Sequence, residues 1–171
     1  NVSIPAIVYG HVPACIIAVI ILPMPSIESF PYIILSALIH QGYQNFLLTA
    51  YQTGKFTTVY PVARGFGPLV ATIISIIFLG VYLKVFTLLS ILLISTGVIF
   101  IGLFSKSVLK NYKILYSSLA TGIFIGIYSV VDGYGARLSM SAISYMSWVF
   151  IFSALIFPIV LKFRKQKNIL K

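Results

Sequence analysis

The sequence has very few acidic residues and few charges of any kind. Among its 171 residues only Glu28 and Asp132 are acidic, and charged residues make up 8% of the chain. A soluble domain usually carries about a quarter charged residues. With 60% hydrophobic residues and a mean hydropathy of +1.07, the chain has too little polar surface to fold alone in water. The shortage of charge therefore argues against an ordinary soluble domain and predicts a protein whose solvent is largely lipid.

Residues suited to covalent, metal or nucleotide chemistry are also scarce. Cys15 is the only cysteine, which excludes an intrachain disulfide. The two histidines, His11 and His40, fall in different apolar segments, and neither joins a Cys or acidic cluster with metal-site spacing. The chain has no P-loop, G-x-S-x-G or H-E-x-x-H motif. We therefore expect no enzymatic activity, no cofactor and no metal.

Six apolar segments predict an all-α, polytopic membrane helix bundle. They cover about residues 6–22, 30–51, 59–79, 85–104, 115–131 and 141–161. Each approaches the ~20 residues that cross ~30 Å of hydrocarbon at ~1.5 Å per residue. The connections are brief, so we expect sequential helices to be antiparallel neighbours. The chain begins at Asn1 without a signal-peptide pattern, and we expect it to be an internal piece of a longer protein.

The basic residues predict an orientation in the membrane. In a soluble protein the net charge of +10 would suggest a nucleic-acid partner, but in a membrane protein Lys and Arg gather in cytoplasmic loops. Two of the twelve, Lys84 and Arg137, lie on one predicted face. The opposite face holds Lys55, Arg64, Lys106, Lys110, Lys113, Lys162, Arg164, Lys165, Lys167 and Lys171. We therefore expect residues 105–114 and the tail after Leu161 to be cytoplasmic, in a multi-pass protein of the cell (inner or plasma) membrane.

Two short sequence stretches suggest an internal repeat. Residues 2–9 read VSIPAIVY and residues 138–145 read LSMSAISY, with Ser, Ala, Ile and Tyr in register. These stretches lie at the starts of the first and sixth apolar segments. Because successive segments cross the membrane in alternating directions, the first and the sixth cross it in opposite directions. An inverted repeat is typical of transporters whose substrate sites lie near the membrane midplane.

The stretch YQTGKFTTVYPVARGFGPL, residues 51–69, resembles the signature of the EamA family in the drug/metabolite transporter superfamily. The matching positions are Gly54, Thr58, Val59, Tyr60, Pro61, Ala63, Arg64, Gly65 and Pro68. A second stretch, YSVVDGYGARLS at 128–139, resembles the end of the sixth helix in that family. The resemblance covers nearly the whole chain and implies helices two to seven of a ten-helix inverted-repeat fold. It divides the chain into the rest of a first repeat, 1–104, and the start of a second, 105–171.

Two features depart from the family pattern. Members usually end the fourth helix with Leu-Gly-Glu, whereas here Leu79 and Gly80 precede Val81. Relatives are also drawn with both termini inside, which would place residues 105–114 outside. We follow the distribution of Lys and Arg, because it belongs to this sequence.

Polar residues inside the apolar segments are the candidate site. His40, Tyr43, Gln44 and Tyr51 follow one stripe of the second segment, and Tyr128 and Asp132 share a face of the fifth. They either line a substrate path or form interhelical hydrogen bonds worth about 0.6 kcal/mol each. Asp132 is expected at a helix end, solvated or paired with Arg137. Trp148, in the sixth segment, is expected either in core packing or in a cavity wall.

Arg64 is the most unusual residue of this set. We expect it in the first turn of the third helix, on one stripe with Tyr60. The surrounding Pro61, Gly65, Gly67 and Pro68 favour a broken helix start that lines a cavity, or close approach of a neighbouring helix. Arg64 would then attract the anionic part of a substrate; snorkelling to the interface or pinning a facing helix are the alternatives.

The function expected from these features is secondary transport, with export of a small polar metabolite by alternating access. A passive channel or facilitator, or a truncated fragment that transports nothing, stay open as alternatives. Expected partners are the lipid bilayer and a small-molecule substrate, with a homodimer as an open possibility. Proton coupling through Asp132 or His40 is a further hypothesis.

Overall fold

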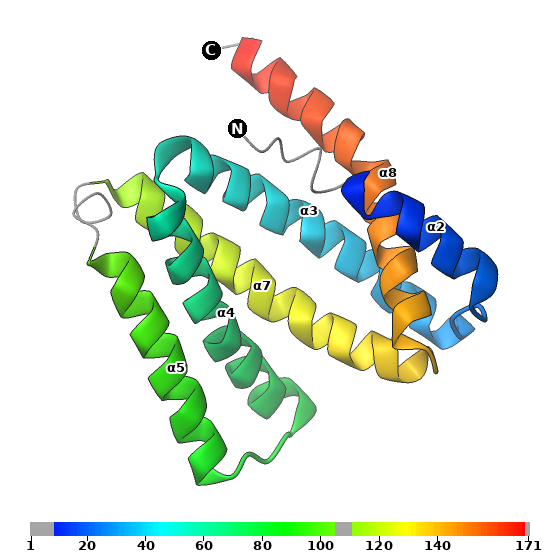
Figure 1. Ribbon diagram of the computed structural model, residues 1–171, viewed down its shortest axis with the longest axis horizontal. Helices are drawn as coiled ribbons and strands as arrows, with labels where there is room; N and C mark the ends of the chain where they lie inside the picture. Colours follow the sequence, from blue (N-terminus) through cyan, green and yellow to red (C-terminus); the bar gives the residue numbers. More distant parts are fainter. Residues whose placement is uncertain (1–8, 105–110, 170–171) are drawn as a thin grey trace. The chain divides into compact units, whose positions relative to one another are not determined.

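The described part of the chain is entirely helical, as the sequence predicts. The computed structural model describes residues 9–104 and 111–169, and Figure 1 labels its helices. The elements are α2 (Val12–Ile21), η1 (Ile27–Ser29), α3 (Phe30–Thr53), α4 (Phe56–Leu79), α5 (Val85–Leu103), α7 (Tyr112–Leu138) and α8 (Ala142–Ile169).

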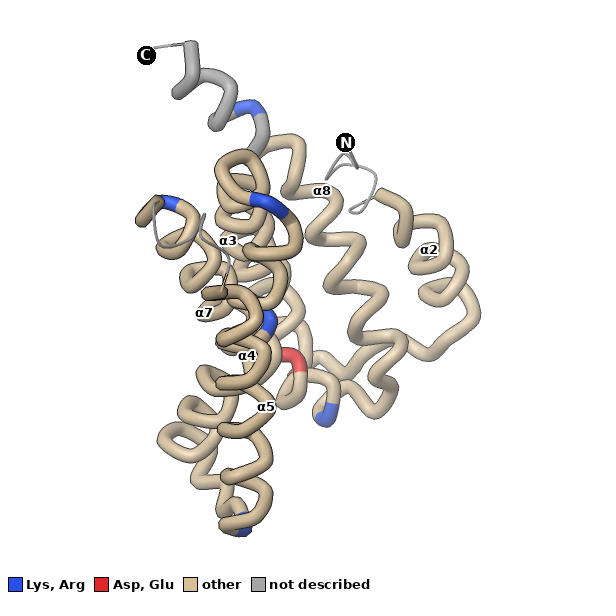
Figure 2. Tube along the Cα trace, turned by 60° about the vertical axis from the view of Figure 1, so that its left-hand side comes forward, with Lys and Arg blue, Asp and Glu red and all other residues tan. Residues whose placement is uncertain are grey.

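Four helices are long and apolar enough to cross a membrane: α4, α5, α7 and the Ala142–Val160 part of α8. Figure 2 shows how few positions along the described tube are charged. The α2 helix has 10 residues, which is short for a span. The α3 helix has 24 residues, but its polar stretch HQGYQN at 40–45 lowers its hydropathy. The fold is therefore compatible with a membrane protein, and the six spans expected from the sequence stay a prediction.

The helices form two compact units. Unit 1 contains residues 1–41 and 131–171, and unit 2 contains residues 42–130. The α3 and α7 helices each contribute one part to each unit. This division follows contacts between residues, whereas the division at residue 104/105 follows the resemblance to a repeat, which stays a prediction.

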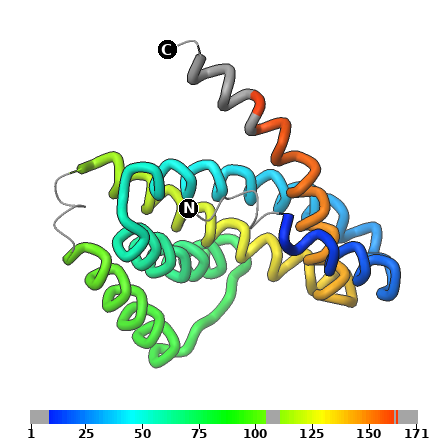
Figure 3. The backbone as a smooth tube through the Cα atoms, turned by 45° about the horizontal axis from the view of Figure 1, so that its top comes forward, coloured from blue at the N-terminus to red at the C-terminus, as the bar shows by residue number. Residues whose placement is uncertain are grey.

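In unit 2, α4 and α5 form an antiparallel hairpin with glycines at its interface (Figures 1 and 3). The turn begins at Gly80, whose φ of 61° lies in the left-handed region. A Cβ added at Gly65 would lie 3.0 Å from the Ser95 carbonyl oxygen, and one at Gly102 would lie 3.1 Å from the Thr58 carbonyl oxygen. Glycine therefore allows the two backbones to approach closely, as is common between membrane helices.

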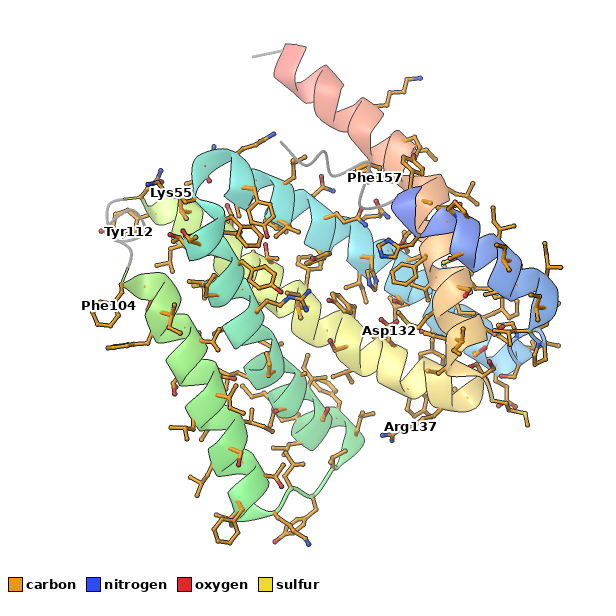
Figure 4. The ribbon with its side chains drawn as sticks, in the orientation of Figure 1. Lys55, Phe104, Tyr112, Asp132, Arg137 and Phe157 are labelled. Atoms are coloured by element: carbon orange, nitrogen blue, oxygen red, sulfur yellow. The ribbon has the colours of Figure 1, made fainter. Side chains whose placement is uncertain are left out.

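The α4 helix packs against the unit 2 part of α7 by the same means. A Cβ at Gly122 would lie 2.9 Å from the Ala63 carbonyl oxygen, and one at Gly126 would lie 2.9 Å from the Ala71 nitrogen. Gly122 and Gly126 form a G-x-x-x-G pair on α7. In Figure 4, Lys55, Phe104 and Tyr112 mark one end of unit 2, where α4 begins, α5 ends and α7 begins. The core there contains Ala50, Val59 and Ile114.

In unit 1, α2 and α8 are antiparallel neighbours (Figure 3). At one end the Tyr9 and Phe157 rings lie 6.3 Å apart, and at the other the Ser144 hydroxyl donates to the Pro23 carbonyl at 2.8 Å. Opposite directions are what an inverted repeat requires of these helices. Residues 2–8 of the first repeat copy lie outside the described residues, so the repeat stays a prediction.

Two boundaries differ from the sequence expectations and move candidate residues. The α4 helix begins at Phe56 and continues through Pro61 and Pro68, so the expected broken helix start is wrong. The reason is that a proline omits one backbone hydrogen bond, which a helix packed on two sides can tolerate. The α7 helix continues to Leu138, so Asp132 lies inside a helix rather than at its end.

Candidate functional site

The polar candidates fall into two groups, one in each unit. We call Ser36, His40, Asp132 and Tyr145 the acid–histidine cluster; all four belong to unit 1. We call Tyr43, Tyr51, Tyr60 and Arg64 the arginine–tyrosine group; all four belong to unit 2. The stripe expected on α3 is therefore divided, with His40 in the first group and Tyr43 and Tyr51 in the second.

Asp132 is held by a hydroxyl group from another helix. The Tyr145 hydroxyl of α8 donates to Asp132 Oδ1 at 3.2 Å. Only 9% of Asp132 is exposed, and Ser36 and Tyr145 are completely buried. The expectation of a solvated acid at a helix end is therefore wrong. Arg137, labelled with Asp132 in Figure 4, is exposed in the last turn of α7.

Gly135 gives Tyr145 its place beside Asp132. A Cβ added at Gly135, one turn after Asp132, would lie 2.5 Å from Tyr145 Cε2 and 2.6 Å from its hydroxyl oxygen. A side chain there would occupy the space of the phenol ring. The glycine in the motif YSVVDGYGARLS therefore lets α8 approach α7 and bring the Tyr145 hydroxyl to the carboxyl group.

His40 continues the cluster on α3. Its Nδ1 atom lies 3.2 Å from the Ser36 hydroxyl oxygen and 2.9 Å from the Ser36 carbonyl oxygen. The His40 ring meets Phe150 of α8 edge to face, with ring centroids 6.2 Å apart, and His11, the residue before α2, stacks on the same Phe150 at 5.6 Å. The acid and the imidazole thus belong to one buried cluster, in which Ser36 contacts His40 and Tyr145 contacts Asp132.

Two further polar residues of unit 1 have packing roles. The Gln41 side-chain amide donates to the Ser153 carbonyl at 2.9 Å and so joins α3 to α8. The Trp148 ring lies 6.1 Å from Phe30 and 5.9 Å from Phe152, against the core of Ile33, Tyr145 and Val149. Of the two interpretations of Trp148, these contacts favour core packing.

In the arginine–tyrosine group a phenol ring lies beside the guanidinium. The Arg64 Cζ atom lies 5.4 Å from the centre of the Tyr60 ring, within the range of a cation–π interaction. The Tyr51 ring of α3 and the Tyr60 ring both pack on Phe56, with centroid distances of 5.6 and 5.0 Å. Arg64 itself is exposed, and 41% of Tyr60 is exposed, so this face of α4 is open in unit 2.

Arg64 lies deeper in its helix than the sequence suggests. It is the ninth residue of α4, eight residues after Phe56, which places it about 12 Å along the helix axis rather than in the first turn. Pro68 has no N–H to donate to the Arg64 carbonyl, the acceptor one turn earlier. A charge at this depth is less suited to simple snorkelling than one in the first turn.

Two other candidates belong to unit 2. The Tyr128 ring of α7 meets Tyr43 edge to face at 5.6 Å between centroids. The Gln44 Oε1 atom is buried and accepts no hydrogen bond within the part of the chain that the structure describes. An acceptor of this kind could receive a hydrogen bond from a bound solute.

Sequence reasoning identified His40, Asp132 and Arg64 but missed the residues that give them partners. Ser36 lies four positions before His40, and that spacing could have shown that the two share a face of α3. Tyr145 entered the sequence analysis only as the last residue of the repeat LSMSAISY. The glycine pair of α7 was a visible signal, since G-x-x-x-G is typical of close helix contacts.

No group of three or more His, Cys, Asp or Glu side chains that could hold a metal ion occurs among the described residues. A scan against protein-family models and searches of curated proteins and of solved structures found no match to this chain.

Proposed function

We propose that this chain forms part of an integral membrane secondary transporter, which exports a small polar metabolite by alternating access. The observation that carries the proposal is the Arg64 guanidinium, which lies beside the Tyr60 ring about 12 Å along an apolar helix. Ionisable groups at such depth are costly in lipid, and they commonly mark a solute path. The resemblance of residues 51–69 to the EamA signature supports the same proposal.

The chemistry of the group indicates the class of solute. Arg64 offers a planar set of N–H donors that suits a carboxylate or phosphate. The tyrosines offer hydroxyl groups and ring faces, and Gln44 Oε1 offers an acceptor. A solute with an anionic part and a hydrogen-bond donor fits this set. Amino acids and sugar phosphates carry both groups and are the substrates to examine first; nucleobases, which offer donors without an anionic part, are the third class to compare.

Counterflow in vesicles tests the proposal. Purified protein is reconstituted, the vesicles are loaded with unlabelled amino acid, sugar phosphate or nucleobase, and uptake of the labelled compound is followed. A carrier shows transient accumulation above equilibrium, whereas a passive channel only equilibrates. A chain that transports nothing shows neither, and that result across the three solute classes contradicts the proposal.

Arg64 variants then assign the role of the group. We expect Arg64→Lys and Arg64→Gln to insert normally and to reduce counterflow at least about tenfold, equivalent to ~1.4 kcal/mol, because both lose the planar fork. Lys84→Gln is the matched control, since Lys84 is exposed at the start of α5. Wild-type counterflow in both Arg64 variants would show that Arg64 does not bind the solute and only anchors its helix.

For location we propose the cell membrane, with residues 105–114 and the tail after Leu161 in the cytoplasm. The distribution of Lys and Arg supports this orientation. Residues 105–110 lie outside the described residues, but Lys113 is exposed near the start of α7. In intact cells, with Cys15 replaced, Lys113→Cys should resist an impermeant thiol reagent, and rapid labelling would reverse the orientation.

A further inference from the structure

The acid–histidine cluster contains one of only two acidic side chains in the chain, and burial of that acid needs an explanation. A buried carboxylate without compensation costs several kcal/mol, and a protonated carboxyl group costs far less. Core packing alone would be served by an apolar residue at position 132. Instead, Gly135 removes the volume that would otherwise keep the Tyr145 hydroxyl away from Asp132. The close packing of α7 and α8 thus gives the buried Asp132 carboxyl group a hydrogen-bond donor.

The His40 Nδ1 atom faces two acceptors of different chemistry. The Ser36 carbonyl can only accept a hydrogen bond, so at 2.9 Å it pairs with a protonated Nδ1. The Ser36 hydroxyl, at 3.2 Å, can either accept from Nδ1–H or donate to a bare Nδ1. Ser36 lies one turn after Ile33, which packs in one buried cluster with Tyr145, the residue that donates to Asp132. Ser36 can therefore connect the acid and the imidazole in two protonation states.

We propose that the acid–histidine cluster is a proton-binding site in which Ser36 relays one proton between Asp132 and His40. In the transfer the Asp132 O–H bond breaks as its proton passes to the Ser36 oxygen, and the Ser36 proton passes to His40 Nδ1. Ser36 gains one proton and loses one, Asp132 becomes a carboxylate and His40 an imidazolium. The Tyr145 hydroxyl then stabilises the carboxylate with the hydrogen bond seen at 3.2 Å.

The surroundings contain few other groups that can titrate or carry charge. From α2, His11 stacks on the far side of Phe150. From α3 and α7, Tyr32 and Tyr134 pair with ring centroids 5.1 Å apart. Arg137 is exposed on α7, five residues beyond Asp132. From α8, Tyr145 is the group that contacts Asp132. The exchangeable proton is therefore assigned to Asp132 and His40, with His11 as the neighbour to control.

The site's role in coupling solute movement to proton movement rests on the transport function proposed above. Its ability to bind a proton does not. The two statements are tested by separate measurements, first on the protein in lipid vesicles without any solute and then during counterflow.

The composition of the chain makes the first measurement direct. In Glu28→Gln, Asp132 is the only acidic side chain, so infrared difference spectra of this variant report its carboxyl group above the background of the C-terminal carboxylate. We expect the band of a protonated carboxyl group to change with pH, and Asp132→Asn to lose that change. A band that stays constant in folded Glu28→Gln protein overturns the proposal.

Histidine variants test the relay. In Glu28→Gln protein, His40→Gln should move the midpoint of the carboxyl change, because the group that receives the relayed proton is removed. His11→Gln is the matched control and should leave the midpoint unchanged. An unchanged midpoint in His40→Gln, or equal shifts in both variants, contradicts the assignment to Asp132 and His40.

Counterflow at several pH values tests coupling, with a pH-sensitive dye inside the vesicles. Loss of proton movement in Asp132→Asn supports coupling. Counterflow with unchanged pH dependence in Asp132→Asn overturns coupling and leaves the transport function standing. Absence of counterflow in wild-type protein whose Asp132 band still changes with pH overturns the transport function and leaves the proton-binding site standing.

Discussion

The two units use polar side chains inside apolar helices in opposite ways. In unit 1, Asp132 is buried and receives a hydrogen bond from Tyr145. In unit 2, Arg64 is exposed and lies beside the Tyr60 ring. The first arrangement satisfies its groups internally, whereas the second leaves donors available. Polar side chains in apolar helices therefore form a closed hydrogen-bond network in unit 1 and an open face in unit 2.

This difference predicts which substitutions affect stability and which affect only activity. Removing one member of a closed network leaves another buried polar group without its partner, at a cost of about 1–3 kcal/mol. Removing a member of an open face exposes groups that solvent or solute can still reach. Each prediction below concerns Tyr145 or Gly135, the glycine on which Tyr145 packs. Each is paired with a control residue that lies outside the acid–histidine cluster.

The largest expected effect is on the most buried aromatic residue. Tyr145 is completely buried, whereas 41% of Tyr60 is exposed. We expect Tyr145→Ala to lower the free energy of unfolding by about 3–5 kcal/mol, and Tyr60→Ala by less than ~1 kcal/mol. Unfolding in mixed detergent micelles, followed by circular dichroism, measures both. Equal losses would mean that the two units do not differ in this respect.

A smaller effect is expected where Gly135 receives the Tyr145 ring. The methyl group of Gly135→Ala would overlap that ring, so we expect a loss of about 1–3 kcal/mol. Gly133→Ala is the matched control on the same helix, because nothing lies within 4 Å of a Cβ there. Alanine is also the better helix former, so the control should be neutral or slightly stabilising. Loss of stability in both variants would show that α7 resists alanine in general.

The smallest expected effect comes from single hydroxyl groups. Tyr145→Phe removes the hydrogen bond to Asp132 and should cost about 0.6–1.5 kcal/mol. Tyr60→Phe keeps the ring beside Arg64 and should leave stability unchanged within about 0.3 kcal/mol. The same unfolding measurement compares them. A Tyr145→Phe protein as stable as the wild type would show that the hydrogen bond to Asp132 does not stabilise unit 1.

The helices themselves were largely predictable from the apolar runs, and the errors have identifiable causes. The sequence placed the end of one helix near residue 131, because Asp132, the glycines and Arg137 resemble a stop signal. The α7 helix continues to Leu138, since Asp132 finds hydrogen-bond partners on other helices. The α4 helix begins three residues earlier than expected and passes through Pro61, which sequence rules treat as a helix break.

The site was predictable in its residue types but not in its grouping. His40, Asp132 and Arg64 were selected because ionisable groups are rare in apolar helices. Helical spacing placed His40 on one stripe with Tyr51, yet its contacts are with Ser36 and Phe150. Spacing along one helix cannot show which side chains other helices bring to it. That information depends on tertiary packing, above all on the position of Tyr145 against Gly135.

The central claim is that the Arg64 face of α4 borders a water-filled path. The direct measurement is labelling of single cysteines, with Cys15 replaced, by a charged thiol reagent on protein in lipid vesicles. Ile94→Cys on α5 is the control, because Ile94 is 64% exposed and adjoins Ser95, which meets Gly65 at about the level of Arg64. We predict rapid labelling of Arg64→Cys and Tyr60→Cys and almost none of Ile94→Cys. Equal protection of all three would place the Arg64 face in lipid or against another helix and contradict the account.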